Sequence, residues 1–299
     1  MNVLALLVPA LLAAQEGREI PRESTVFASS VSKDGVRTNY ADASVFKLDD
    51  GTYRMVLNTF TTDARSGRVL RSHLASAVSK DGLRFEIEED LGFEGVATPR
   101  VFRFPGGFRM YYPSHHRSKG SLHVTKISSA FSKDGRKFEE EGVRIEPAAE
   151  AKSVGGPAIY RLDDGTCRML FDEDTEPRGR IPRGKIFGAS SKDGLTWSRD
   201  EAPTVEQPAK GREPGHAMHP FVLRYEERYF LLYSVHGRTH RARSSDGLAF
   251  ERLGPLGIAG ADPDAIVLEN GDVRIFYGDF KPERGGEIYS AVVPKAAWR

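Results

Sequence analysis

Paired hydrophobic runs, each pair joined by a turn, recur along the chain. In the first pair, residues 42–48 and 53–58 are rich in apolar and aromatic side chains, and Asp50 and Gly51 lie between them. Two such runs joined by a glycine-containing turn predict a β-hairpin, because glycine adopts the positive φ angles that tight turns need. Four more pairs follow, at residues 98–112, 156–171, 219–233 and 262–277. The pattern therefore predicts five hairpins of similar design.

A second motif, Ser-x-Asp-Gly, also occurs five times. Its aspartates are Asp34, Asp81, Asp134, Asp193 and Asp246, spaced 47 to 59 residues apart. A period near 50 residues is typical of the blades of a β-propeller. Because Asp-Gly favours a tight turn, we interpret these aspartates as turn residues rather than as catalytic ones. After each of the last four turns an aromatic residue follows at fixed spacing, and we expect it to pack between neighbouring sheets: Phe85, Phe138, Trp197 and Phe250.

Together the two motifs predict an all-β fold, a five-bladed β-propeller built from four-stranded antiparallel blades. The first Ser-x-Asp-Gly motif precedes the first hairpin, so we expect the N-terminal segment to supply outer strands to the last blade and to close the ring. Residues 288–293 also have the pattern of a strand in that blade. Because no change in composition marks a linker, residues 15–299 are predicted to form a single domain. Cys167 stands where Tyr53 stands in the first repeat, which indicates a core side chain.

Charge and cysteine content exclude several classes of function. Lys plus Arg (43) nearly balance Asp plus Glu (42), and the net charge of +1 gives no long-range attraction to nucleic acid or to an anionic membrane. The single cysteine excludes an internal disulfide, a cysteine-based zinc cluster and a CxxC redox centre. A nucleic-acid partner is therefore not expected, and we expect a monomer.

The N-terminus has the pattern of a secretory signal. Residues 3–12 are almost wholly apolar and are followed by Ala13, Ala14 and Gln15. We therefore expect residues 1–14 to be a signal peptide and the protein to be secreted or periplasmic. The alternative is a disordered or buried N-terminal segment. The apolar run is short for a bilayer span and no other window approaches that length, so membrane insertion is not expected.

The propeller geometry also predicts where a ligand site lies. The innermost strand of each blade starts, and the second strand ends, at the same mouth of the central channel, so side chains from all blades converge there. Strand starts bring Asp42, Arg100, His219, Asp262 and Asp264 to this mouth. Strand ends bring Asn58, His115, His116, Asp172, Glu173, Asp174, His236 and Asp279. Carboxylates, histidines and an arginine around a channel suit sugar hydroxyls, so an oligo- or polysaccharide is the expected ligand.

Tyrosines near the same mouth offer flat faces for sugar stacking, with packing between the sheets as the alternative for each. They are Tyr111, Tyr112, Tyr233 and Tyr277.

The repeated pattern x-Pro-x followed by two hydrophobic residues, then a charged turn and an aromatic strand, resembles the five-bladed propellers of the arabinanase, levansucrase and invertase superfamily of glycoside hydrolases. The resemblance implies three acids at the channel mouth: an Asp that acts as base or nucleophile, an Asp that orients and tunes, and a Glu that acts as general acid. Asp42 matches the first acid, whereas Arg100 and Gly155 stand at the second and third positions. His219 matches a histidine that in many relatives lies beside a central water or cation, which implies a divalent cation such as calcium near His219.

We therefore expect a glycosidase-like enzyme in which Asp42 is the base and another acid replaces the missing Glu, because glycoside hydrolysis usually needs two carboxyl groups. Candidates for that acid are Asp172, Asp174, Asp262 and Asp264. For the acidic run at residues 172–176, the alternative is a solvated loop paired with the arginines at 178, 180 and 183. We also expect Arg100 to lower the pKa of Asp42.

Three other functions stay open at this point. A non-catalytic carbohydrate-binding propeller would use Arg100 and the histidines to hold an acidic sugar or another carboxylate. A metal-dependent activity would use His216, His219 and His236 with nearby aspartates. A sialidase-like protein is the third alternative, because residues 191–197 are similar to an Asp-box, although that box has one residue more between Asp and Gly.

Overall fold

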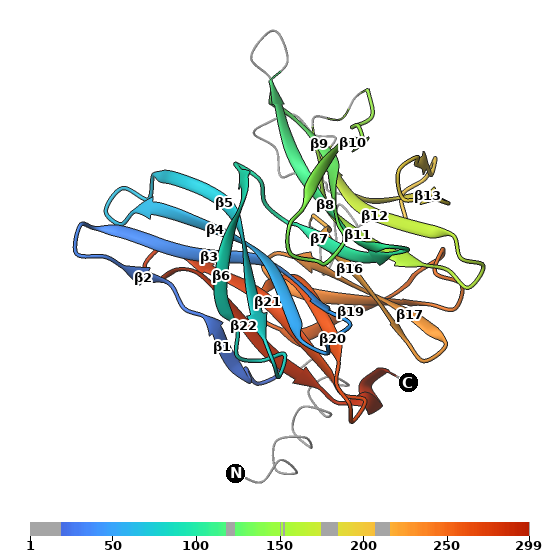
Figure 1. Ribbon diagram of the computed structural model, residues 1–299. Coiled ribbons are helices and arrows are strands. Elements are labelled where there is room, and N and C mark those ends of the chain that lie inside the picture. The colour runs from blue at the N-terminus through green and yellow to red at the C-terminus, as the bar shows by residue number, and fades with distance from the viewer. Residues whose placement is uncertain are drawn as a thin grey trace.

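The computed structural model describes residues 19–117, 123–149, 151, 153–174, 185–206 and 216–298. In this part of the chain the regular structure is β-strand, apart from one short 3₁₀-helix, η1 (Lys295–Trp298), near the C-terminus (Figure 1). The all-β prediction is thus confirmed. The predicted signal peptide, residues 1–14, lies outside the described residues.

The strand pairing divides the chain into successive antiparallel units, which we number 1 to 5. Unit 1 contains β2 (Ser30–Val31), β3 (Val36–Lys47), β4 (Tyr53–Asp63), β5 (Val69–Ser79) and β6 (Glu86–Glu94). Unit 2 contains β7 (Arg100–Phe104), β8 (Gly107–Arg117), β9 (His123–Ser132) and β10 (Glu139–Ile145). Unit 3 contains β11 (Ser153–Arg161), β12 (Cys167–Asp174), β13 (Lys185–Ser191), β14 (Ser198–Arg199) and β15 (Val205–Glu206). Unit 4 contains β16 (Met218–Tyr225), β17 (Arg228–Val235), β18 (Arg238–Ser244) and β19 (Glu251–Ile258). Unit 5 contains β20 (Ala261–Val267), β21 (Val273–Lys281), β22 (Gly285–Val293) and β1 (Ser24–Phe27).

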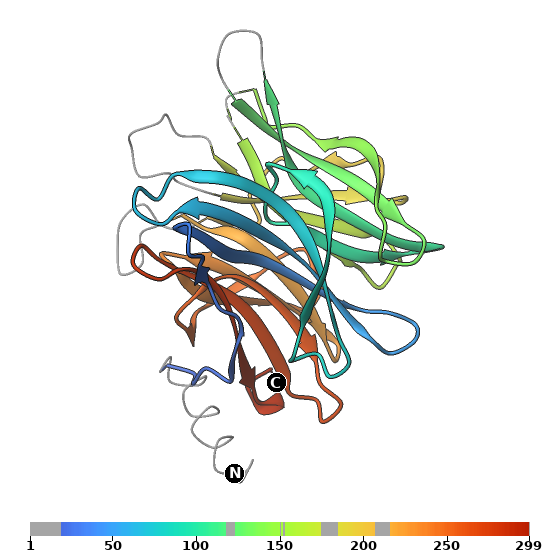
Figure 2. The ribbon, with the colours of Figure 1, turned by 60° about the vertical axis from the view of Figure 1, so that its left-hand side comes forward.

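The first strands of the units lie next to one another. Strand β3 contacts β7, β7 contacts β11, β11 contacts β16, β16 contacts β20, and β20 contacts β3. Figures 1 and 2 show the sheets standing around the region that these strands share. Units 2 and 3 are joined into one hydrogen-bonded sheet, because β11 also pairs in parallel with β9 through Ser153 and Thr125. The start of each first strand is therefore brought close to the starts of the others.

The N-terminal segment completes unit 5. Strand β1 pairs with β22, and Glu23, just before β1, forms a two-pronged ion pair with Arg274 of β21 in which both N–O distances are 2.7 Å. Ser290 Oγ donates a further hydrogen bond of 2.9 Å to Glu23. A segment near the start of the described chain thus fills the outer position of the last unit, as the sequence predicts.

The Glu23–Arg274 pair repeats a device found in other units. An arginine at the start of the second strand is buried there and binds an acid from the outer part of the same unit. The pairs are Arg54 with Glu88, Arg109 with Glu141, and Arg168 with Asp200. In unit 4 the corresponding residue is Phe230, against which the Trp298 ring of η1 packs edge-on. In units 1, 2, 3 and 5 an arginine–acid pair therefore ties the sheet across its width.

The Ser-x-Asp-Gly motif forms the expected turn. Asp193 Oδ1 accepts hydrogen bonds from the backbone N–H groups of Leu195 (2.8 Å) and Thr196 (2.9 Å), and from Ser191 Oγ (2.9 Å). These bonds, led by the one from Thr196, lower the pKa of Asp193 to about 2. The same three bonds recur at Asp81 and Asp246, so the structural role of this aspartate is confirmed.

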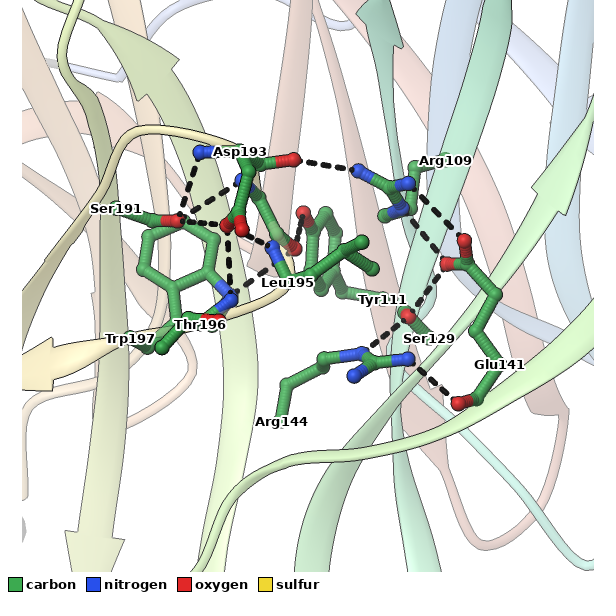
Figure 3. Close-up of polar contacts among 11 residues, drawn as sticks. Arg109, Tyr111, Ser129, Glu141, Arg144, Ser191, Asp193, Leu195, Thr196 and Trp197 are labelled. Carbon is green, nitrogen blue, oxygen red and sulfur yellow. Dashed lines mark hydrogen bonds and ion pairs between the residues drawn. The ribbon is translucent and has the colours of Figure 1, made fainter.

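The turn of Asp193 also docks on the preceding unit (Figure 3). Tyr111 of unit 2 donates its hydroxyl hydrogen bond to the Gly194 carbonyl (2.7 Å), and Arg109 donates to the Asp193 carbonyl (3.1 Å). The aromatic residue after the turn packs between units as predicted: the Trp197 ring lies edge-on to Tyr111, with centroids 5.9 Å apart. Cys167 is fully buried in the same cluster, which confirms its core position.

Candidate active site

Each unit carries one residue in the left-handed backbone region within or just before its first strand. These residues are Asp42 (φ 56°), Thr98 (φ 44°), Gly156 (φ 50°), His219 (φ 49°) and Asp262 (φ 55°). In all units but the second, the register between the first and second strands shifts at this point. Such bulges re-aim a side chain, and non-glycine residues held at positive φ cluster at functional sites. The fold thus turns one residue per unit toward a common point.

This backbone feature refines the alignment of the repeats. By conformation Thr98, rather than Arg100 two residues later, is the counterpart of Asp42 in unit 2. In unit 3 the counterpart is Gly156, next to Gly155. Neither Thr98 nor the two glycines has a carboxyl group, so the absence of an acid at these two positions holds under either alignment. The signal that identifies the position in the sequence is the proline that follows it in units 2 to 5.

Three of the five residues form one polar cluster, which we call the Asp42–His219–Asp262 cluster. His219 Nδ1 pairs with Asp262 Oδ1, and the Asp42 and Asp262 carboxyl groups share a hydrogen bond. Backbone groups fix both acids: the Thr98 N–H donates to Asp42 Oδ2 (3.2 Å), and the Asp262 N–H donates to Ser234 Oγ (2.8 Å). The side chains of His219 and Asp262 are 23% and 18% exposed, so solvent and small ligands reach them.

The cluster separates the proton affinities of its two acids. Burial and the neighbouring Asp262 charge raise the pKa of Asp42 to about 6, against the opposing effects of His219 and the Thr98 N–H. Burial also disfavours the charged form of Asp262, but the positive charge of His219 and its hydrogen bond outweigh burial and lower the pKa of Asp262. As the pH falls, Asp42 therefore takes up a proton while Asp262 stays ionised.

His219 is the cation of the cluster. Burial disfavours its charged form, yet Asp262 foremost, then Asp172 and Asp42, raise its pKa to about 10. Asp172, at the end of β12, accepts a hydrogen bond of 2.9 Å from the His219 N–H. A side chain at Gly156 would collide with Asp172 Oδ1, so the glycine is what lets Asp172 approach His219. Sequence reasoning identified Asp42, Asp172, His219 and Asp262, but missed the parts played by Thr98, Gly156 and Ser234.

Arg100 and Asp264 differ from expectation. Both are buried, and they form an ion pair with each other. Arg100 also donates to three backbone carbonyls, those of Ala43, Pro157 and Pro263, each at 3.3 Å. The arginine therefore binds units 1, 3 and 5 from inside the channel instead of facing a ligand at its mouth. The expectation that Arg100 lowers the pKa of Asp42 is wrong. The pKa of Asp42 is raised, and Arg100 pairs with Asp264 instead.

Two further candidates are structural. Tyr112 is buried, donates its hydroxyl hydrogen bond to Glu140 (3.2 Å) and packs edge-on against Phe93, so it is no stacking platform. Glu173 is buried as well, and accepts hydrogen bonds from the Ala148 N–H and from Arg199, both at 2.8 Å. The acidic run that ends β12 thus contains a residue held inside the sheet. Tyr111, Tyr233 and Tyr277 are also buried, as their packing alternative predicts.

The other candidates lie at the ends of second strands. Asn58 is buried and accepts a hydrogen bond of 3.0 Å from Ser72 Oγ. Asp174 is half-buried at the end of β12. His236 is exposed, and with Asp279 it lines a cavity beside Asp262. The side chains of His115 and His116 lie outside the described part of the structure.

The described part of the chain has neither a metal-ligand cluster nor a membrane-spanning helix. No three His, Cys, Asp or Glu side chains there are grouped so that they could hold a metal ion, and His216, His219 and His236 thus do not form a ligand set. Nor does any helix there have the length and apolar character needed to cross a bilayer.

Comparison with known proteins defines the class of fold. A thermostable family-43 glycoside hydrolase superposes with a TM-score of 0.67 at 17% identity, over 89% of this chain and 91% of that one. The GH43_1 enzyme from Xanthomonas citri complexed with xylotriose gives a TM-score of 0.64 at 17% identity, over 95% and 92% of the two chains. Zg3597, a family 117 glycoside hydrolase from Zobellia galactanivorans, gives 0.69 at 13% identity, over 92% and 90%.

No protein-family model and no curated protein sequence matches the chain. The fold is therefore that of the arabinanase and invertase-like propellers, as the sequence resemblance implies, and the likeness at these low identities is one of fold. The comparisons thus define the fold and leave the chemistry of the Asp42–His219–Asp262 cluster as the guide to function.

Proposed function

We propose that this protein cleaves glycosidic bonds at the Asp42–His219–Asp262 cluster, with Asp42 as the proton donor. The observation that carries the proposal is the contact of two carboxyl groups whose pKa values move in opposite directions beside one cationic histidine. Pairs of acids with separated pKa values are how enzymes assign acid and base roles. The sequence pattern alone suggested Asp42 as a base; its raised pKa and its shared hydrogen bond with Asp262 favour the opposite role.

In this mechanism the proton of Asp42 moves to the glycosidic oxygen as the bond from that oxygen to the anomeric carbon breaks. Asp262 stays ionised and, by repulsion, keeps the proton on Asp42 at a pH where an ordinary Asp would have lost it. A water molecule attacks the anomeric carbon, and Asp172 is the carboxylate proposed to accept its proton. His219 holds the Asp262 charge in place through its ring and Asp172 through its backbone N–H.

Asp42 and Asp262 are too close to serve as the two acids of one hydrolysis. Carboxyl groups about 5–5.5 Å apart retain and those about 6.5–9.5 Å apart invert the anomeric configuration, whereas a hydrogen-bonded pair leaves no room for a sugar or a water. The second carboxylate must therefore come from outside this pair. Asp172 meets that need because it contacts His219 from a different unit. A polymeric sugar as substrate also agrees with the predicted secretion.

The test is a screen of the wild-type protein against aryl glycosides and against plant and microbial polysaccharides. We expect release of sugar from at least one substrate, and a loss of about 100- to 10,000-fold in Asp42→Asn, the usual contribution of a positioned proton donor. Asp172→Asn should lose activity on every substrate, including aryl glycosides with good leaving groups, on which a missing proton donor matters less. Equal background rates in the wild type and in Asp42→Asn would end the proposal.

A further inference from the structure

A cavity of about 330 Å³ opens beside the cluster, between units 4, 5 and 1. Asp262 lies at its wall, with Tyr40 of β3, Phe60 of β4 and Phe280 of β21. The volume falls at the lower end of the range usual for small-ligand sites. We call this space the Phe280 groove. The end of β21 runs along this cavity, away from Asp262.

Two glycines keep the Phe280 groove open. A side chain at Gly278 would begin 3.5 Å from Asp262 Oδ2, so this glycine lies directly beside the acid. A side chain at Gly286 would begin 3.0 Å from the Tyr40 carbonyl and 3.3 Å from the Phe60 ring. Gly286 is also the direct cross-strand partner of Phe280. The space that these side chains would occupy is therefore left for a ligand between two aromatic residues.

Phe280 has the position of a stacking platform. Its side chain is 59% exposed, the joint highest exposure among the large hydrophobic residues of the described chain. Residues two apart on a strand face the same side, so Phe280 projects on the same side as Gly278, and about 7 Å further from Asp262. The ring of Phe280 is thus placed for the sugar next to the one at Asp262.

The charges in the Phe280 groove favour a neutral sugar. Asp279 is the acid beside Phe280, and its carboxylate pairs with Arg284 (2.7 Å) and with Lys281 (3.4 Å). An acidic sugar would have to compete with Asp279 for these cations and would face the negative charge of Asp262. Neutral hydroxyl groups meet neither obstacle, because carboxylate and carbonyl oxygens accept their hydrogen bonds.

We propose that the Phe280 groove is a second sugar subsite, so that the substrate is a neutral oligosaccharide of at least two rings rather than a single-sugar glycoside. The inference rests on the proposed function, since it takes the sugar cleaved at Asp42 as its point of reference. Phe280 is a specificity-determining residue in this scheme. It binds the face of the neighbouring sugar and takes no part in proton transfer.

Binding measurements separate this inference from catalysis. The parent for them is Asp42→Asn, and the probes are xylotriose, arabinotriose and mannotriose with their monosaccharides, followed by saturation-transfer NMR and calorimetry. We expect Phe280→Ala to weaken binding of the favoured trisaccharide by about tenfold, the size of one lost aromatic contact, and to leave the monosaccharide unchanged. Phe280→Trp should restore the loss. Gly278→Ala, whose added methyl makes ordinary contacts, should also weaken trisaccharide binding.

Leu248→Ala is the matched control, because Leu248 is an exposed apolar residue on a turn of unit 4 and should alter neither affinity. Equal trisaccharide affinity in Phe280→Ala and its parent would overturn the subsite, as would an equal loss for the monosaccharide or the failure of every probe to bind the parent. Binding that depends on Phe280 without turnover by the wild type would instead overturn the proposed function and leave the subsite standing.

Discussion

The channel contains two acid–cation pairs built on neighbouring residues, and they have opposite characters. Asp262 pairs with His219, and Asp264, two residues further along β20, pairs with Arg100. His219 has three carboxyl groups near it and its ring is partly exposed, whereas Arg100 is buried with one acid and three carbonyl partners. The first pair therefore lies within reach of solvent, whereas the second is enclosed by its own acid and by backbone carbonyls.

The difference teaches that position near the axis does not make a charged residue catalytic. Burial raises the pKa of Asp264 to about 6, although Arg100 opposes it, and that value matches the one for Asp42. The same shift accompanies a structural acid in one case and a candidate proton donor in the other. What separates them is access: the Asp42–His219–Asp262 cluster borders a cavity in which the Asp262 side chain is 18% exposed, whereas Arg100 and Asp264, at the wall of a different cavity, are only 6% and 1% exposed.

Removing Arg100 should produce the largest effect on stability. Arg100→Ala leaves Asp264 buried without its cation, and we expect the free energy of unfolding to fall by about 3–5 kcal/mol, measured by urea unfolding. Without Arg100 the pKa of Asp264 rises further, so the carboxyl is protonated and neutral in acid. The loss should therefore shrink as the pH is lowered from about 8 to about 5.

Replacing both partners with apolar residues, Arg100→Met with Asp264→Leu, should recover most of the lost stability, because no buried charge is then left alone. If Arg100→Met kept full stability and lost sugar binding, the contrast between the two pairs would break, and Arg100 would belong to the ligand site.

The pH dependence of activity gives the next sharpest comparison. A proton donor must be protonated, so the rate should fall as the pH rises through about 6, the pKa of Asp42. Asp262→Asn removes the negative charge that raises this pKa, and the descending limb should move to lower pH. Asp264→Asn, measured at a temperature where it is folded, is the matched control and should leave the limb in place. If the descending limb moved equally in Asp262→Asn and Asp264→Asn, the distinction between the two acid–cation pairs would be lost.

We expect the smallest effect from replacing a turn aspartate, because the role of that acid is confined to local structure. Asp193→Ala loses the hydrogen bonds that close one turn, and we expect a loss of about 1 kcal/mol in unfolding free energy with an unchanged rate profile. Because the folded-state pKa of Asp193 is lowered, this stabilisation is present above the ordinary Asp pKa and disappears as the pH falls toward about 2. A change in the rate profile of Asp193→Ala would contradict the purely structural assignment.

Local patterns in the sequence were enough for some of these features. The turn role of Asp193 follows from Ser-x-Asp-Gly itself, because its hydrogen bonds reach only three residues along the chain. The same holds for the hairpins and for the core position of Cys167. The repeat also placed Asp42, His219 and Asp262 at one mouth, because equivalent residues of successive units must converge in a propeller.

Other features depend on contacts that no local pattern contains. Arg100 was expected at the mouth, and its actual partners come from three different units, including Asp264 at a separation of 164 residues. The raised pKa of Asp42 arises from Asp262 in another unit, so its role as donor was not visible in the sequence. Phe280 was overlooked because an exposed aromatic at a strand end carries no motif; the glycines two residues before it and opposite it are the only signal.

The Glu23–Arg274 contact has a consequence for how the molecule is made. Its two residues are 251 positions apart, so β1 leaves the ribosome early and meets β22 only when synthesis is nearly finished. Contacts of such long range slow folding. Before they form, the edge of β22 is unpaired and can bind another strand. At high concentration that edge is where the β1 segment of a second molecule would enter, producing domain-swapped dimers during refolding.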